Sequence, residues 1–195
     1  MKGGIVVKIL LLDNYDSFTY NIFHYLRAHG VEVDVFRNDA ISVQKALTYN
    51  AIVLSPGPGL PSEAGIMMEV IKAAHSTKPI LGVCLGLQAI IEFFGGSLKN
   101  LGKVIHGRSS QCLVTENSIL FDNIQSPFEV GHYHSWVADV VPNDLIVTAK
   151  NEDNLVMAVR HKSLPIEAVQ FHPESVLTPE GKQMIKNWVN SIKNI

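Results

Sequence analysis

Residues 79–96 read PILGVCLGLQAIIEFFGG. An apolar, strand-like run ends in Cys84, which stands between Gly82 and Gly86, and a helix-like run follows at once. A buried strand favours Val or Ile at such a point, and the two glycines indicate that the backbone bends sharply around the thiol. The layout G-x-Cys-x-G is that of a nucleophile elbow, a tight strand-to-helix turn that exposes a nucleophile at the carboxyl edge of a sheet.

The position of the thiol would favour its reactivity. Cys84 would sit at a helix N-terminus, where unpaired N–H groups and the helix dipole favour the thiolate. The N–H of the next residue, Leu85, would then face the place where an oxyanion forms. The alternative is an inert thiol in an apolar core.

The composition sets wide limits on the class of protein. The chain has 195 residues, a formal net charge of −2 and 47% hydrophobic residues. This predicts a single domain over residues 1–195, with neither a nucleic-acid nor a membrane partner. No apolar run approaches the roughly 18–20 residues that span a bilayer. The N-terminal stretch MKGGIVVKILLLDNYD lacks a small-residue cleavage site, so we interpret it as a first strand and not as a signal peptide.

The chain contains two cysteines, Cys84 and Cys112, without a paired spacing. This argues against a disulfide framework or a zinc knuckle, and it is typical of a protein in the reducing cytoplasm.

The first half of the chain alternates strand-like and helix-like segments, which predicts an α/β fold with a mostly parallel, doubly wound sheet. Continuous apolar runs of this kind are typical of strands covered on both faces. The predicted strands are 6–13, 31–36, 51–55 and 79–83, and the predicted helices are 17–29, 42–49 with Ser42 as N-cap, about 64–76, and the segment after Cys84.

In the second half of the chain, the strand–helix alternation gives way to a series of short strands. Short strands are predicted within 110–116, 128–139, 144–150, 155–162 and 166–171, and we expect them to extend the parallel sheet as antiparallel strands. A helix over 178–193 closes the chain, with Thr178 as N-cap and Pro179 at the first helical position.

A catalytic thiol needs a base and a group that orients the base. The segment AVQFHPES, residues 168–175, supplies both. Pro173 favours an extended conformation at His172, and in an extended chain residues two apart face the same side. His172 and Glu174 could therefore point the same way, with the carboxylate fixing the imidazole tautomer. The alternative is a surface pair at the end of a strand.

The loop SPGPG, residues 55–59, also follows a predicted strand, so it should reach the same sheet edge as Cys84. Its glycines can present backbone N–H groups at close range, giving a second oxyanion donor. It lacks the GK[ST] ending of a P-loop and the spacing of a dinucleotide fingerprint, which weakens a phosphate-binding interpretation. The remaining alternative is a plain Pro/Gly turn.

Taken together, GVCLGLQA, LSPGPGLPSEAG and AVQFHPES resemble the class I (triad) glutamine amidotransferases. LLDNYDSFTYN near the start and GHYHSW at 131–136 narrow the resemblance to the branch that serves chorismate-using synthases. These five motifs occur in the family order over nearly the whole chain. The resemblance implies the flavodoxin-like fold of that family.

By this resemblance, Cys84 attacks the side-chain amide of L-glutamine, His172 protonates the departing ammonia and Glu174 holds His172. Water then hydrolyses the thioester to glutamate. The resemblance places the oxyanion hole at Leu85 and Gly59. It places the glutamine contacts at Gly57, Pro58, Gly59, Gln88, Ser135 and Trp136. It implies no cofactor.

Four further positions need comment. The family usually has His where this chain has Leu87, for which we expect altered packing without loss of activity, and Leu is common where Trp136 stands. His132 and His134 alternate on a predicted strand, but no carboxylate or cysteine has matching spacing, so we expect no metal site.

The ammonia must be used by a partner, because the 195 residues contain no further segment that could bind and aminate chorismate. The resemblance implies a chorismate-using synthase subunit, namely component I of anthranilate synthase in tryptophan biosynthesis. The loop 13–19 and the edge around Cys84 would face it. The alternatives are aminodeoxychorismate synthase in folate biosynthesis, service to both synthases, a stand-alone cysteine hydrolase, and a regulatory subunit with a vestigial triad. A receiver-like phosphoacceptor site at Asp13 and Asp16 is the weakest interpretation.

Overall fold

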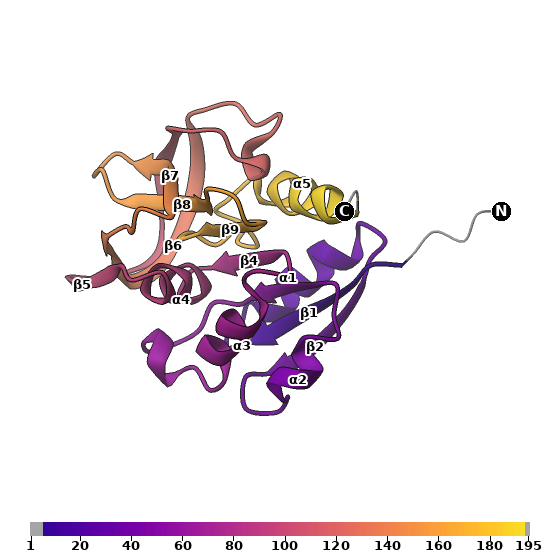
Figure 1. Cartoon of the computed structure of the whole chain (residues 1–195). Coiled ribbons are helices and arrows are strands. Elements are labelled where there is room, and N and C mark those ends of the chain that lie inside the picture. Colours follow the sequence, from indigo (N-terminus) through magenta and orange to yellow (C-terminus); the bar gives the residue numbers. More distant parts are fainter. Residues whose placement is uncertain (1–5, 194–195) are drawn as a thin grey trace.

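The computed structural model describes residues 6–193. Among these residues, nine strands form a single sheet in the order β2-β1-β3-β4-β9-β8-β7-β5-β6 (Figure 1). The strands are β1 (Lys8–Asp13), β2 (Glu32–Arg37), β3 (Ala51–Leu54), β4 (Ile80–Val83), β5 (Ser97–Val114), β6 (Phe128–Val140), β7 (Leu145–Asn151), β8 (Val156–His161) and β9 (Ile166–Val169).

The helices connect and cover this sheet. They are α1 (Thr19–Arg27), α2 (Val43–Ala46), α3 (Met67–Ala74), α4 (Leu85–Phe93) and α5 (Gly181–Lys193), with 3₁₀ turns η1 (Pro61–Glu63) and η2 (Ile119–Phe121). The predicted α/β fold with a mostly parallel, doubly wound sheet and antiparallel additions is confirmed. Residues 1–5 of the predicted N-terminal strand stretch lie outside the described residues.

The parallel half of the sheet sets the position of the functional groups. β2, β1, β3, β4 and β9 run parallel, so their carboxyl ends meet at one edge. The last strand, β9, was expected to be antiparallel, and this is wrong for its pairing with β4. β9 pairs parallel with β4 and antiparallel with β8, and so joins the two halves of the sheet.

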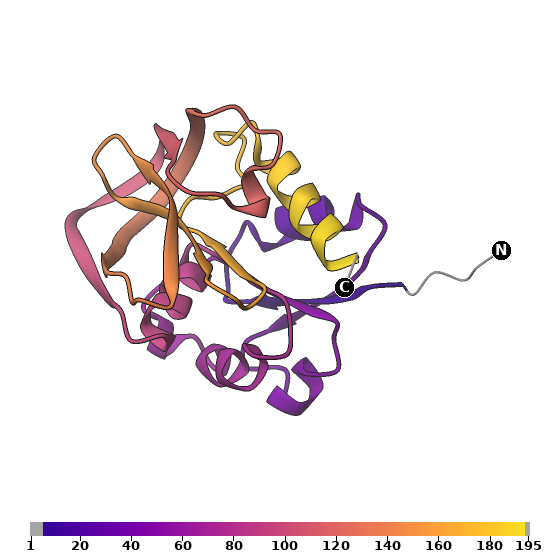
Figure 2. The same ribbon diagram turned by 45° about the horizontal axis from the view of Figure 1, so that its top comes forward.

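Helices cover both faces of the parallel half, as a doubly wound sheet requires. Along β1, Ile9 and Leu11 pack into the layer under α1 and α5, whereas Leu10 and Leu12 pack into the layer under α3 and α4. All four side chains are fully buried. Figure 2 shows α5 beside α1 on the first face, and the two helices are in contact.

The antiparallel half extends further than the sequence predicts. β5 begins at Ser97, about a dozen residues before the predicted strand at 110–116, and it pairs along most of its length with β6. Its first part is largely polar and exposed, so it carries little apolar alternation to mark a strand. Backbone pairing with β6 forms it instead.

Of the two predicted N-caps, Ser42 is confirmed and Thr178 is not. The hydroxyl of Ser42 accepts a hydrogen bond from the N–H of Lys45, so this N-cap is confirmed. The closing helix starts at Gly181, three residues later than the predicted cap at Thr178. The Thr178 hydroxyl donates to the carbonyl of His172 and accepts from the N–H of Gly131, so it anchors the site described below.

No helix within residues 6–193 is both long and apolar enough to cross a membrane.

Candidate active site

Cys84 occupies a strained turn between β4 and α4. Its φ is 52° and its ψ is −98°, a combination that non-glycine residues rarely adopt. The N–H of Cys84 donates to the carbonyl of Val169 at 2.8 Å, which ties the turn to β9. Such strain costs about 1–3 kcal/mol and is concentrated at functional sites. The backbone conformation therefore marks Cys84 as the residue that this turn presents.

The flanking glycines are required by close backbone approach, as the sequence predicts. A Cβ on Gly82 would lie 2.7 Å from the carbonyl carbon of Gly86, and a Cβ on Gly86 would lie 2.6 Å from the carbonyl oxygen of Leu54. Real Cβ atoms essentially never come this close to backbone. Strand and helix can meet at this angle only because both positions lack a side chain.

His172 and Glu174 form a buried pair. The distance from His172 Nδ1 to Glu174 Oε1 is 2.7 Å, and both residues are 2% exposed. The predicted reason for their meeting is wrong, because β9 ends at Val169 and the chain is not extended here. Residues 172–175 form a turn closed by a hydrogen bond from the Ser175 N–H to the His172 carbonyl. The turn brings the two side chains together where a strand was expected to do so.

Aromatic rings hold the imidazole in place. The ring centroids of Tyr133 and Phe18 lie 4.9 Å and 5.7 Å from that of His172, both edge-on. Phe18 belongs to the loop after β1, so this loop contacts the histidine directly. Nε2 of His172 is buried and makes no hydrogen bond to a described residue, which leaves it available for proton transfer.

The charge of His172 follows from its neighbours. Burial lowers the pKa of His172, but the Cys84 thiolate and the Glu174 carboxylate outweigh burial and hold that pKa well above its ordinary value. The arrangement favours the charged imidazolium form of His172. A charged imidazole next to a thiolate is the resting state that thiol nucleophiles require.

A pocket of about 180 Å³ opens beside Cys84. Ligand sites for drug-sized molecules occupy about 300–1,000 Å³, so this pocket suits a small metabolite. Every glutamine contact predicted from the sequence lines it. Its walls are formed by Gly57, Pro58, Gly59, Cys84, Gln88, Val104, Tyr133, His134, Ser135 and Trp136. Leu85 lies one residue beyond Cys84 as the first residue of α4, so its N–H has no partner in the helical ladder.

The SPGPG loop is fixed by buried polar contacts. The N–H of Asn14 donates to the hydroxyl of Ser55 at 2.8 Å, and the Asn14 amide donates to the Ser55 carbonyl at 2.9 Å. A Cβ on Gly57 would lie 2.6 Å from Asn14, so the loop passes directly over the end of β1. Gly59 has φ +76°, and the next N–H, that of Leu60, donates to Glu63 at 2.8 Å.

Three residues of the site were not singled out by the sequence analysis: Val104, Tyr133 and Gln170. His134 was considered there only as a possible metal ligand. The amide of Gln170 lies 3.6 Å from Cys84 Sγ. No local signal marks Gln170, because the extended-chain spacing that would group it with His172 and Glu174 does not hold where the chain turns at residues 172–175. Val104 carries no local signal either, since β5 was not predicted to begin before it.

His132 and His134 interact with each other. His132 Nδ1 lies 3.1 Å from His134 Nε2, and Ser110 Oγ lies 2.7 Å from His132 Nε2. Burial lowers the pKa of His132 to about 4 and that of His134 to about 3, so both rings are neutral at pH 7. Within residues 6–193, no group of three or more His, Cys, Asp or Glu side chains could hold a metal ion.

The remaining positions have structural explanations. Asp13 Oδ1 accepts hydrogen bonds from the N–H of Asp16 and from the hydroxyl of Thr19, so it orders the loop after β1. Leu87, within α4, is fully buried among apolar side chains and does not line the pocket. It therefore contributes to packing.

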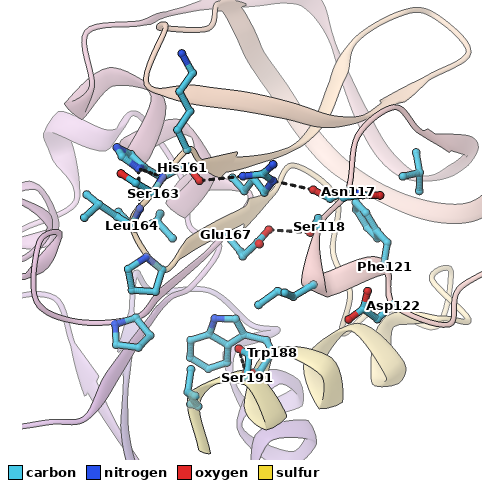
Figure 3. Close-up of a pocket in the computed structure, with 18 of the residues that line it drawn as sticks. Asn117, Ser118, Phe121, Asp122, His161, Ser163, Leu164, Glu167, Trp188 and Ser191 are labelled. Atoms are coloured by element: carbon cyan, nitrogen blue, oxygen red, sulfur yellow. Dashed lines mark hydrogen bonds between the residues drawn. The ribbon is translucent and has the colours of Figure 1, made fainter. Parts of the chain in front are cut away.

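A larger cavity, of about 930 Å³, lies at the opposite edge of the sheet, before β4 and β9 begin (Figure 3). None of Cys84, His172 and Glu174 lines it. Glu167 faces it and receives a hydrogen bond of 2.8 Å from Ser118. Arg160 also lines the cavity, but its Nε donates to the carbonyl of Asn117 at 2.7 Å.

These features agree with the comparison with known proteins. The model of the glutamine amidotransferase class-I family matches residues 10–192, and the chain belongs to this family. The solved structure described as a "putative gmp synthase subunit a protein" from Thermoplasma acidophilum has a TM-score of 0.87 and is 28% identical, covering 97% of this chain and 94% of that one.

Within the family, two similar proteins match over nearly their whole length. The chain is 42% identical to anthranilate synthase component 2 of Haemophilus influenzae, covering 97% of this chain and 100% of that protein. It is 41% identical to aminodeoxychorismate/anthranilate synthase component 2 of Bacillus subtilis, covering 95% and 97%. Other relatives are longer. The chain is 44% identical to the bifunctional protein TrpGD of Thermotoga maritima, and that match covers 96% of this chain but 33% of that protein.

Proposed function

We propose that this chain is a single glutaminase domain that supplies ammonia to a chorismate-using synthase, with anthranilate synthase as the first candidate. The observation that carries the proposal is the joint placement of a strained Cys84 and the buried His172–Glu174 pair beside a small pocket. The pocket is lined by the residues that the family resemblance assigns to glutamine.

The first half-reaction forms a thioester. The Cys84 thiolate attacks the side-chain amide carbon of glutamine, and the carbonyl oxygen becomes an oxyanion that accepts hydrogen bonds from the N–H groups of Leu85 and Gly59. The imidazolium of His172 then gives its Nε2 proton to the leaving nitrogen, which departs as ammonia. Losing one oxyanion donor typically costs about 100-fold or more in rate.

The second half-reaction releases glutamate. Neutral His172 takes a proton from water, the resulting hydroxide attacks the thioester carbon, and the thiolate leaves. Glu174 holds the Nδ1 side of the ring throughout, which keeps Nε2 directed at the reacting atoms. Gln88, Ser135 and Trp136 would hold the amino-acid end of the substrate.

Exposed apolar side chains support a partner at the carboxyl edge of the sheet. Val176, which follows the His172–Glu174 turn, is 92% exposed, and Val104 at the pocket is 73% exposed. Tyr15, in the loop after β1, is 49% exposed. Val104 lines the pocket, whereas Tyr15 and Val176 lie in segments that follow the carboxyl ends of β1 and β9. Exposed apolar side chains at one edge of a sheet can form an interaction site. The names of the relatives support a synthase subunit as this partner, either anthranilate synthase component I or the aminodeoxychorismate synthase counterpart.

The test measures glutamate release from glutamine by the purified chain, alone and with each synthase subunit plus chorismate. We expect stimulation and formation of anthranilate with the first partner, both abolished in Cys84→Ser. Activity that responds only to the aminodeoxychorismate synthase subunit would move the protein to the folate branch. Absence of thiol-dependent glutamate release under every condition would overturn the proposal.

A second variant tests the docking edge. Val176→Asp should weaken binding of the synthase subunit by at least about 10-fold, because it places a charge in an apolar interface. Val140→Asp is the matched control, since Val140 is also exposed but lies at the end of β6, next to Gly96 beyond the far end of α4. Equal effects of the two variants would contradict docking at the carboxyl edge.

A further inference from the structure

Gln170 is a buried amide in contact with the nucleophile. It is fully buried and directly follows β9, where its backbone N–H donates to the carbonyl of Met157 at 2.8 Å. Its side-chain Nε2 lies 3.6 Å from Cys84 Sγ, within hydrogen-bonding distance for sulfur. Neither the predicted triad nor the predicted glutamine contacts include it.

The amide of Gln170 is oriented by a second glutamine. Its Oε1 accepts from Nε2 of Gln88 at 3.4 Å, and the same nitrogen of Gln88 donates to the carbonyl of Trp136 at 3.0 Å. Because Gln88 offers a donor, the Gln170 oxygen must face Gln88 and the Gln170 nitrogen must face the sulfur. The amide therefore presents only N–H groups to Cys84.

A donor in this position distinguishes between the two forms of the thiol. A neutral thiol is a weak acceptor, whereas a thiolate accepts a charge-assisted hydrogen bond that is considerably stronger. The other titratable groups around the sulfur are His172, held by Glu174, and the neutral pair His132 and His134 on β6. Unlike these groups, Gln170 is not titratable, and its amide donates a hydrogen bond to the sulfur.

We propose that Gln170 is a further catalytic residue, whose side-chain N–H hydrogen-bonds the Cys84 thiolate and stabilises it together with the His172 imidazolium. The proton that leaves Sγ resides on His172, and Gln170 carries no proton transfer. Gln88 fixes the amide orientation and so links the glutamine pocket to the nucleophile. The expected effect of Gln170 on glutamine turnover rests on the glutaminase function proposed above. Stabilisation of the Cys84 thiolate by Gln170 does not depend on that function.

The test is the pH dependence of alkylation of Cys84 by iodoacetamide, followed by mass spectrometry. Gln170→Met keeps the volume and removes the donor. We expect the midpoint of the pH profile to rise by about one unit, so that alkylation below the midpoint slows about 10-fold. Cys112 is fully buried, and burial raises the pKa of its thiol to about 12, so it should not react. Gln111→Met on the exposed face of β5 is the matched control and should leave the midpoint unchanged.

Turnover gives a second readout. In Gln170→Met, kcat/KM for glutamine should fall about 10-fold while KM changes less than about twofold, because the donor acts on the nucleophile. A purely packing role would lower the melting temperature and leave the alkylation midpoint in place. That result in a folded variant overturns the proposal.

If Gln170→Met does not fold, Gln170→Glu preserves the shape and places a carboxylate beside the sulfur. Its midpoint should rise by more than about one unit through like-charge repulsion, and an unchanged midpoint overturns the proposal equally. Failure of the wild-type chain to release glutamate would refute the proposed glutaminase function. It would leave the role of Gln170 at the thiolate intact, since the alkylation profile is measured without glutamine.

Discussion

Each end of the parallel strands has a cavity and a buried glutamate close to it, and the two ends differ in almost every other respect. At the carboxyl edge, a pocket of about 180 Å³ lies beside Cys84, and Glu174 there pairs with a cationic imidazole. At the amino edge, a cavity of about 930 Å³ contains Glu167, which accepts a hydrogen bond from the neutral hydroxyl of Ser118 (Figure 3). Burial raises the pKa of Glu167 to about 7.

The comparison of the two cavities shows that cavity size does not identify a reactive site. The small pocket coincides with a strained backbone, close-packed glycines and a paired charge, each of which costs free energy and persists because other contacts enforce it. The larger cavity shows no comparable concentration of strained or paired groups among the residues that line it. Four predictions test this contrast, from the largest expected effect to the smallest.

Exchanging each buried glutamate for its amide should separate the two edges most clearly. Glu174→Gln leaves the imidazole without its anionic partner, so kcat for glutamate release should fall by about 100-fold or more. Glu167→Gln should change kcat less than about twofold. Steady-state glutaminase assays measure both, and comparable losses in the two variants would show that the amino edge also serves the reaction.

Gly86→Ala tests whether close approach is specific to the carboxyl edge. The added Cβ would meet the backbone of Leu54 at 2.6 Å, so the free energy of unfolding should fall by about 3 kcal/mol. Ser191→Ala at the large cavity should cost less than about 1 kcal/mol, the value of one hydrogen bond. Urea denaturation gives both numbers. A Gly86→Ala protein as stable as the wild type would refute the packing argument.

The pH dependence of stability tests Glu167. Its folded-state pKa of about 7 lies above the ordinary value of 4.5, so the unfolded chain releases the proton at lower pH. The contribution of Glu167 to stability is therefore largest below pH 4.5, falls as the pH rises towards 7 and is level above it. The loss should amount to about 3 kcal/mol, and Glu167→Gln should remove it. Unfolding curves between about pH 5 and pH 8 decide this, and identical slopes for both proteins would show that burial does not raise the pKa of Glu167.

Trp136→Leu should have the smallest effect. Residue 136 holds Gln88 through its backbone carbonyl, which the substitution keeps, while the ring lines only the pocket wall. We expect KM for glutamine to change about two- to fivefold while the turnover number stays nearly constant. If turnover instead fell about 10-fold or more, the Trp136 ring would take part in the reaction itself.

The features that could be predicted from the sequence are the local ones. The elbow at Cys84 was predicted because two glycines, a thiol and an apolar strand lie within a few consecutive residues. The pairing of His172 with Glu174 was predicted for the wrong reason, since a turn and not a strand joins them. The first part of β5 was missed because its side chains are exposed and polar, so no periodic pattern encodes it.

The sequence by itself determined the α/β class, the elbow, and the predicted glutamine contacts that line the pocket, because each depends on local backbone geometry or on short motifs. Only the tertiary structure decided that β9 lies parallel to β4, that Thr178 anchors His172 instead of capping a helix, and that Gln170 contacts the thiol. These contacts join segments up to 86 residues apart. Which of many such segments meet is set by packing of the whole sheet, and no local pattern carries that information.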